Sequence, residues 1–144
     1  MRNRKGNAAI EFALGAGVLV ATFVGTFQYG YTFLQYNRLQ MAVAQGARYA
    51  SMAPYDSATT TPSSTFLSSV RNMVVYGNPT SGTYAVLPGL TPSNITLTVN
   101  FANGVPSAIT LGVTGYTING LFGTFTLTGK PQFTYPYVGI WTPL

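Results

Sequence analysis

The sequence contains no cysteine and no histidine, and its only acidic residues are Glu11 and Asp56. These absences exclude disulfides, thiol nucleophiles, zinc sites of the usual ligand types and histidine-based general catalysis. A serine or threonine nucleophile would have no histidine to activate it, and the two carboxylates lie in segments of different character, so they form no catalytic pair. We therefore expect no enzyme, no metal site and no cofactor, and we disfavour a membrane-anchored hydrolase.

Charge of either sign is scarce. Charged residues make up 6% of the 144 residues, against about 25% in ordinary soluble domains. The net charge of +5 comes largely from Arg2, Arg4 and Lys5, which stand together at the N-terminus. The other cations are scattered singly, whereas a nucleic-acid surface needs them clustered on one face. We expect no nucleic-acid binding, and a surface that does little to keep identical copies apart.

Proline is absent before Pro54, and Glu11 is the only formal charge between Asn7 and Leu34. About 20 residues of this stretch are apolar enough to cross a bilayer as a helix. Because three cations precede the stretch and none follows until Arg38, the positive-inside rule keeps the N-terminus in the cytoplasm and exports the rest. A 144-residue chain then has room for one small exported domain besides this segment.

Two simpler interpretations of the apolar stretch compete with an assembly role. A removable signal peptide fits a basic start followed by an apolar run, but the run exceeds the usual length of about 7–15 residues and offers a poor cleavage site. A plain membrane anchor leaves Glu11 unexplained, because an acid near the bilayer centre costs about 2.5–3.5 kcal/mol. Close to the interface that cost falls, so Glu11 either reaches the headgroups or meets a partner.

The residues RNRKGNAAIEF resemble a type IV prepilin leader, in which a short basic segment ends in glycine and the fifth residue after it is glutamate. More widely, residues 8–51 are similar to the TadE-like family of the tight-adherence (Tad) pilus systems. Three motifs carry this resemblance: an A-x-E-F-A opening, a glycine-plus-aromatic exit from the apolar run, and an L-Q-x-A-x-x-x-G-A-R-Y-A segment. They lie at Ala9 to Ala13, Gln28 to Tyr31, and Leu39 to Ala50.

The resemblance implies that a prepilin peptidase cleaves between Gly6 and Asn7 and removes the basic leader that carries Arg2, Arg4 and Lys5. Cleavage would create an α-amino group on Asn7, with an ordinary pKa of about 7.7–8.0. In related pilins this cation is thought to meet the glutamate of a neighbouring subunit, here Glu11, with Phe12 beside it. Gly6 has a simpler interpretation as a flexible joint before the helix.

The helix is expected to continue beyond the membrane, from Asn7 to about Ser51, over roughly 67 Å at 1.5 Å per residue. Its outer half carries residues that recur at spacings of three and four and so share one face: Tyr36, Leu39, Val43, Gly46 and Ala50. Its apolar half carries four glycines, Gly15, Gly17, Gly25 and Gly30. These either allow close helix packing or are simply tolerated, as glycine often is in membrane helices.

The rest of the chain predicts an α+β fold, in which helices are segregated from a small antiparallel sheet. We expect a leader at 1–6, the long helix at 7–52, a Pro/Ser/Thr-rich linker at 53–65 and an exported β-rich domain at 66–144. The domain would begin with a short helix capped by Ser63 or Ser64. Three or four strands would follow, with hairpin turns at Asn103-Gly104 and Asn119-Gly120, and the sheet would pack on the outer half of the long helix.

Together these features predict a pilin-like structural subunit, major or minor, of an extracellular Tad-type filament. Its expected partners are other copies in a helical filament, the prepilin peptidase, the pilus assembly machinery and, before assembly, the bacterial inner membrane. The alternative is a permanently membrane-anchored binding module that uses the aromatic C-terminal segment. The members of that segment, more often found in cores or subunit interfaces, are Phe133, Tyr135, Tyr137 and Trp141.

Overall fold

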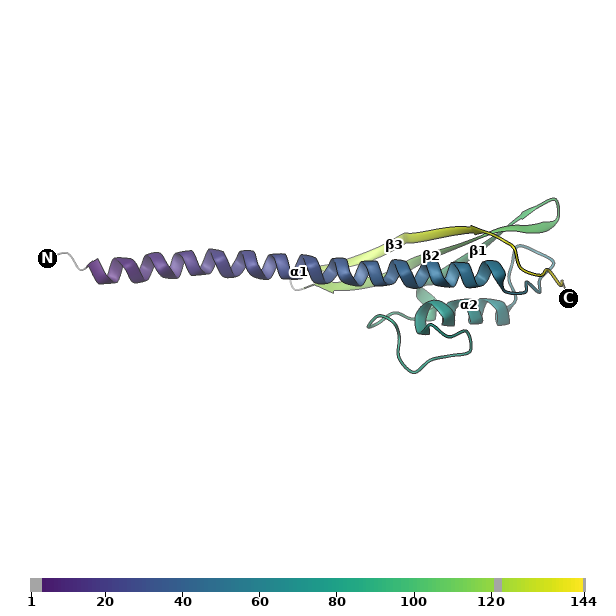
Figure 1. Ribbon diagram of the computed structural model, residues 1–144, viewed down its shortest axis with the longest axis horizontal. Helices are drawn as coiled ribbons and strands as arrows, with labels where there is room; N and C mark the ends of the chain where they lie inside the picture. Colours follow the sequence, from purple (N-terminus) through teal and green to yellow (C-terminus); the bar gives the residue numbers. More distant parts are fainter. Residues whose placement is uncertain (1–3, 121–122, 144) are drawn as a thin grey trace.

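The computed structural model describes residues 4–120 and 123–143 and confirms the α+β class. A single long helix, α1 (Arg4–Met52, 49 residues), runs the length of the molecule, and its N-terminal half projects alone while a small domain lies beside its outer half (Figure 1). The helix begins three residues earlier than expected, since Arg4 to Gly6 are already helical. The early start arises because arginine and lysine favour helical structure and this stretch contains no proline. The helix ends just before Pro54, as the restriction on residues that precede proline predicts.

The outer half of α1 is held by a stripe of small and branched side chains. Leu39, Val43 and Ala50 are fully buried, and Gly46 lies between them. A Cβ on Gly46 would overlap the Val74 side chain and lie 3.4 Å from Leu111 Cδ2. Glycine at this position therefore allows α1 to approach both the second helix and the sheet closely.

The second helix, α2 (Ser64–Tyr76), has clear local causes at both ends. The Ser63 hydroxyl accepts a hydrogen bond from the Phe66 amide at 3.1 Å, so Ser63 is the N-cap. Gly77 ends the helix in the left-handed conformation with φ of 70°, and its amide donates to the Met73 carbonyl. Its apolar face packs against α1 and completes one side of the core.

A three-stranded antiparallel sheet in the order β1-β2-β3 covers the other side. The strands are β1 (Ile95–Ala102), β2 (Val105–Gly120) and β3 (Gly123–Pro136), preceded by a 3₁₀ turn at Pro92–Asn94. The turn predicted at Asn103-Gly104 is confirmed, since both residues have positive φ, 52° and 81°. Inward residues of the sheet form the core with α1 and α2, while threonines line its outer face, where Thr110 and Thr134 hydroxyls lie 2.9 Å apart.

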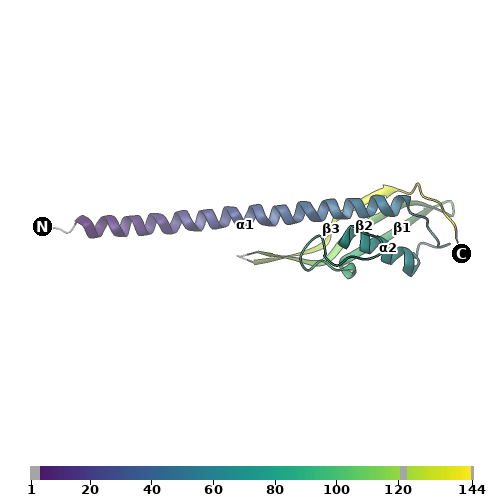
Figure 2. The same ribbon diagram turned by 60° about the horizontal axis from the view of Figure 1, so that its bottom comes forward.

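The turn predicted at Asn119-Gly120 is misplaced. Asn119 pairs with Thr124 and Gly120 pairs with Gly123, so both are strand residues, and the connection falls at positions 121 and 122, outside the described residues. The cross-strand pairs just before this point extend the ladder: Ile118 lies opposite Phe125, and the hydroxyls of Thr117 and Thr126 lie 3.1 Å apart. As a result the β2-β3 ribbon reaches back along α1 toward the N-terminus, clear of the rest of the domain (Figure 2).

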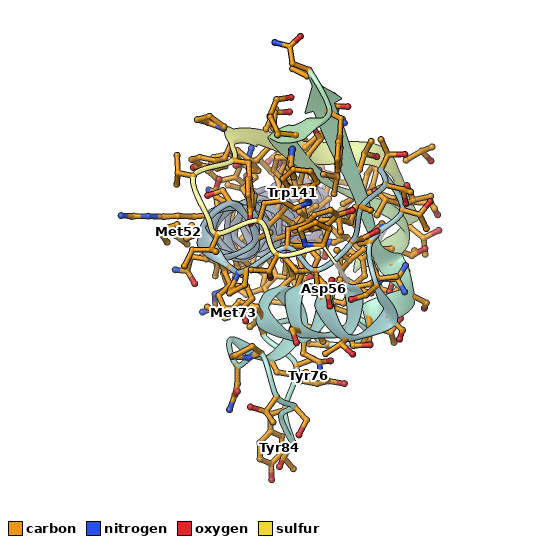
Figure 3. All side chains as sticks on the ribbon, turned by 90° about the vertical axis from the view of Figure 1, so that its right-hand side faces the viewer. Met52, Asp56, Met73, Tyr76, Tyr84 and Trp141 are labelled. Carbon is orange, nitrogen blue, oxygen red and sulfur yellow. The ribbon has the colours of Figure 1, made fainter. Side chains whose placement is uncertain are left out.

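The segment expected to be a linker is packed against the domain. Tyr55 is fully buried, its ring lies edge-on to Phe66 and Phe101, and its backbone forms a bridge with Trp141. The Asp56 carboxylate accepts a hydrogen bond from the Ser63 hydroxyl at 2.7 Å. Figure 3 shows Trp141 and Asp56 together at the end of the domain where α1 finishes, near Met52. The domain therefore begins directly at the end of α1.

Candidate membrane and assembly helix

The N-terminal half of α1 exposes large apolar side chains on all sides. Ile10, Phe12 and Phe23 are each more than 60% exposed, which is unfavourable in water for so many neighbouring residues. By length and composition Gly6–Met52 can cross a membrane, and none of its most apolar stretch is buried within the chain. Thr22 and Thr26 donate their hydroxyl hydrogens to backbone carbonyls four residues earlier, at 2.8 and 2.9 Å, so they add little polarity to this surface.

The residues predicted for processing and assembly all lie on this exposed half. Arg2 lies outside the described residues, as do the side chains of Arg4 and Lys5. Gly6 has open space around it, and Asn7 and Glu11, four residues apart, share one face of the helix. Among the described side chains, Glu11 has no hydrogen-bonding or charged partner. The fold thus presents Glu11 at the surface.

The glycines predicted for helix packing fall into two groups. Gly15, Gly17, Gly25 and Gly30 have no atom of another element within 4 Å of the position that a Cβ would take, so none is required by contacts among the described residues. Gly15 also lines a shallow apolar groove along α1 together with Val18 and Thr22. Of the stripe predicted on the outer half, Leu39, Val43, Gly46 and Ala50 are buried under the domain, and Tyr36 is partly buried.

A cleft that the sequence did not reveal lies between α1 and the far end of the β2-β3 ribbon. Its volume is about 500 Å³ and nearly all of its surface is apolar. The Gln28 side chain packs over Gly120, where a Cβ would overlap it, and donates to the Thr32 hydroxyl at 3.1 Å. The residues that line it come from both sides: Gly25, Tyr29, Phe33 and Tyr36 of α1, and Ile118, Phe125 and Leu127 of the ribbon. The alternation of Phe125 and Leu127 with threonines indicates that they share one face of the strand. Which residues they lie opposite depends on the strand register, so the cleft could not be predicted from this alternation.

The aromatic C-terminal segment serves the fold itself. The Trp141 indole nitrogen donates to the Ser57 carbonyl at 3.0 Å. The Tyr137 hydroxyl accepts from the Tyr55 amide at 2.9 Å and lies within 3.0 Å of the carbonyl oxygens of Ala53 and Ile140, to one of which it can donate at a time. Burial raises the pKa of both Tyr137 and Tyr55 above the ordinary value of 10.0. These rings clasp the end of α1, and together with Phe133 and Tyr135 they pack on the core.

The comparisons with known proteins address the helix. No curated protein and no solved structure matches the chain. Residues 6–48 match the family model of the TadE-like proteins. The match covers the apolar half of α1 and most of the stripe that packs under the domain, so it confirms the resemblance carried by the N-terminal motifs. It also indicates an association with the Tad pilus, and the apolar helix indicates membrane anchoring. Residues 6–48 are therefore similar to the TadE-like proteins, and the chain continues beyond them into α2 and a three-stranded antiparallel sheet.

Proposed function

We propose that this chain is a structural pilin-like subunit that is inserted in the inner membrane, trimmed after Gly6, and assembled into a Tad-type filament through α1. The observation that carries the proposal is the long apolar half of α1, which no other described element covers and which presents Glu11 five residues after Gly6 within a TadE-like segment. The same surface would face lipid in the precursor and neighbouring helices in the filament. The prepilin peptidase and the pilus assembly machinery are the partners that this route requires.

Electrostatics supports a specific role for Glu11. A carboxylate and an α-ammonium group about 4 Å apart attract by roughly 4 kcal/mol at an effective dielectric constant of 20. This attraction is at least as large as the cost of inserting an acid, which is about 2.5–3.5 kcal/mol at the bilayer centre and lower near the interface, where Glu11 lies in a span from Ala8 to Phe27. An unpaired Glu11 therefore raises the free energy of a subunit in the membrane, and pairing with a docked neighbour removes this cost. Since Asn7 and Glu11 lie four residues apart, parallel neighbours that form this pair would be offset by about 6 Å along the helix.

The shape and surface of the domain fit a filament coat. Most of the domain lies to one side of α1 (Figure 2), so parallel helices can gather with their domains outward. Its exposed sheet face is rich in threonine, and only Arg38, Arg48, Arg71, Lys130 and Asp56 contribute charge beyond the apolar half of α1. Copies can therefore pack closely with little repulsion between like charges.

Substitution of Glu11 tests the assembly contact. We expect Glu11→Ala and Glu11→Gln to insert in the membrane normally and to lose most filament yield, because neither can pair with an α-ammonium group. Glu11→Asp is the matched control, since it keeps the charge on a shorter side chain and should retain part of the yield. Sheared filaments and membrane fractions are quantified by immunoblotting. Normal filament yield from both neutral variants would refute the contact.

A permanently anchored binding module is the competing function, and the mature N-terminus separates the two. Intact-mass spectrometry of the native protein should show a chain that begins at Asn7, and Gly6→Val should leave it beginning at Met1, because a branched side chain hinders the close approach of a peptidase to the backbone. A wild-type chain that keeps Met1 and stays wholly in the membrane would favour the anchored module. The internal use of Tyr137 and Trp141 already argues against an aromatic binding surface.

A further inference from the structure

The geometry points to a lipid-binding role for the cleft between α1 and the β2-β3 ribbon: before assembly it holds the acyl-chain and headgroup region of an outer-leaflet phospholipid. This inference rests on the membrane-inserted stage of the proposed function and adds a contact that the helix alone does not provide. The cleft is bounded by Gly25, Tyr29 and Tyr36 on α1 and by Ile118 and Phe125 on the ribbon.

The position of the cleft along α1 is the first argument. A hydrocarbon core of about 30 Å takes about 20 helical residues, and the apolar run from Ala8 to Phe27 supplies them. The outer boundary of the hydrocarbon then falls next to Gln28, which packs against Gly120 at the tip of the ribbon. The cleft extends along α1 from Gly25 to Tyr36, about 16 Å at 1.5 Å per residue. It thus begins within the acyl-chain region and passes through the headgroup layer.

The chemistry of the rim is the second argument. Tyr29 is 83% exposed and Phe125 is 58% exposed, and Phe27 and Tyr31 lie exposed at the same level. Aromatic side chains gather at membrane interfaces because their rings are apolar and the tyrosine hydroxyl can reach water or headgroups. Polar side chains of the lining come from Gln28, which donates to the Thr32 hydroxyl, and from Tyr29 and Tyr36. A ligand with a long apolar portion and a polar end matches this lining.

The size of the cleft is the third argument. The cleft has a volume of about 500 Å³. Volumes of about 300–1,000 Å³ are typical of sites for small molecules. Figure 2 shows the β2-β3 ribbon extending beside α1 toward its membrane-spanning half.

Site-directed spin labelling tests the proposal, and the absence of native cysteine makes single labels simple to place. Four variants of the full chain are labelled: Phe125→Cys in the cleft, Thr126→Cys on the opposite face at the same level, Phe23→Cys in the membrane-spanning run, and Val138→Cys at the far end of the domain. They are reconstituted singly into nanodiscs of phosphatidylethanolamine and phosphatidylglycerol. Collision rates are then measured with oxygen, which dissolves in lipid, and with a nickel chelate, which stays in water.

We expect the label at position 125 to resemble that at position 23, with frequent oxygen collisions and strong loss of nickel collisions, while labels at positions 126 and 138 remain accessible to nickel. Equal nickel access at positions 125 and 126 would overturn the proposal. It would also fail if position 125 became shielded only in assembled filaments, which would assign the cleft to another copy. In a Glu11→Gln background the lipid contact should persist although assembly is lost, so failure of the cleft and failure of the assembly contact can be told apart.

Discussion

At the scale of single residues, the Tyr137 hydroxyl and Glu11 differ in whether their partners lie within the chain. The Tyr137 hydroxyl lies among the backbone groups of Tyr55, Ala53 and Ile140 and joins the C-terminal segment to the end of α1. Glu11 is the opposite case, a charged group with no described partner inside the chain. One residue therefore completes a contact within the domain, whereas the other is available to a second molecule.

Alkaline pH should lower the stability of the domain, because buried tyrosines must ionise. Burial raises the pKa of Tyr55, Tyr116 and Tyr137 above 10.0. The unfolded chain releases these protons at lower pH than the folded chain, so the stabilisation is fully present below about pH 10 and is lost as pH rises through the folded-state pKa values. Thermal unfolding in detergent, followed by circular dichroism with tyrosinate absorbance, should show a melting temperature that falls above pH 10.

Two phenylalanine variants isolate the contribution of the buried hydroxyl. Tyr137→Phe should lower the free energy of unfolding by about 1 kcal/mol at neutral pH, because a partly buried hydrogen-bonding group is removed, and should reduce the alkaline loss. Tyr84→Phe is the control, since Tyr84 is 86% exposed, and should behave as the wild type. An alkaline response that is identical in all three proteins would show that Tyr137 does not contribute to it.

At the scale of elements, α1 is one continuous helix whose two halves have different surroundings. Its apolar half is exposed all round, while its outer half buries one stripe against α2 and the sheet. Gly46 lies where α1 packs against both Val74 of α2 and Leu111 of β2. Close packing therefore requires glycine at position 46, whereas no described contact requires it at position 30.

Alanine substitutions at these two glycines should have opposite effects. Gly46→Ala should destabilise the domain by about 1–3 kcal/mol, because the added methyl group overpacks a core in which the branched Val74 side chain is stiff. Gly30→Ala, with no neighbour within 4 Å, should be neutral or more stable by up to about 1 kcal/mol. Denaturant unfolding of the full chain in detergent measures both. Equal stability of the two variants would contradict the packing assigned to Gly46.

Much of this architecture could be predicted from periodicity. The spacing of Leu39, Val43 and Ala50 indicated the buried stripe, and alternation with threonine indicated the strands, because both patterns follow from local geometry. The end of the β2-β3 ribbon could not be predicted, since the Asn119-Gly120 turn pattern competes with cross-strand pairs that only the register reveals. The packed role of Tyr55 was equally hidden, because its partners Phe101 and Trp141 are distant in sequence.

For the whole molecule, the scarcity of charge means that association apart from the proposed Glu11 contact should depend on apolar and hydroxyl surfaces. The apolar half of α1 offers the largest unpaired area, and the outer sheet face offers threonine hydroxyls. Charges outside the predicted leader are few and widely separated, and salt screens exposed charges over about 10 Å at 0.1 M. Filament cohesion should therefore depend little on ionic strength.

Purified filaments test this expectation and the stoichiometry together. Sedimentation should recover the same filament mass from low and high concentrations of sodium chloride, whereas a detergent that solvates the apolar helix should release subunits. Ordinary salt-driven dissociation would point instead to a charged interface. In the same preparation, quantitative mass spectrometry shows whether this chain is the chief component, as a major subunit requires, or is present in trace amounts, as a minor subunit requires.

The unbroken course of α1 also fixes an angular relation. No hinge separates the segment around Glu11 from the stripe that carries the domain, so the domain turns with the helix as one body. Each residue in a helix advances the direction of a side chain by about 100°. The number of residues between Glu11 and Leu39 thus sets the angle about the helix axis between Glu11 and the domain. Insertion of a single residue there would rotate the domain by about 100° relative to Glu11.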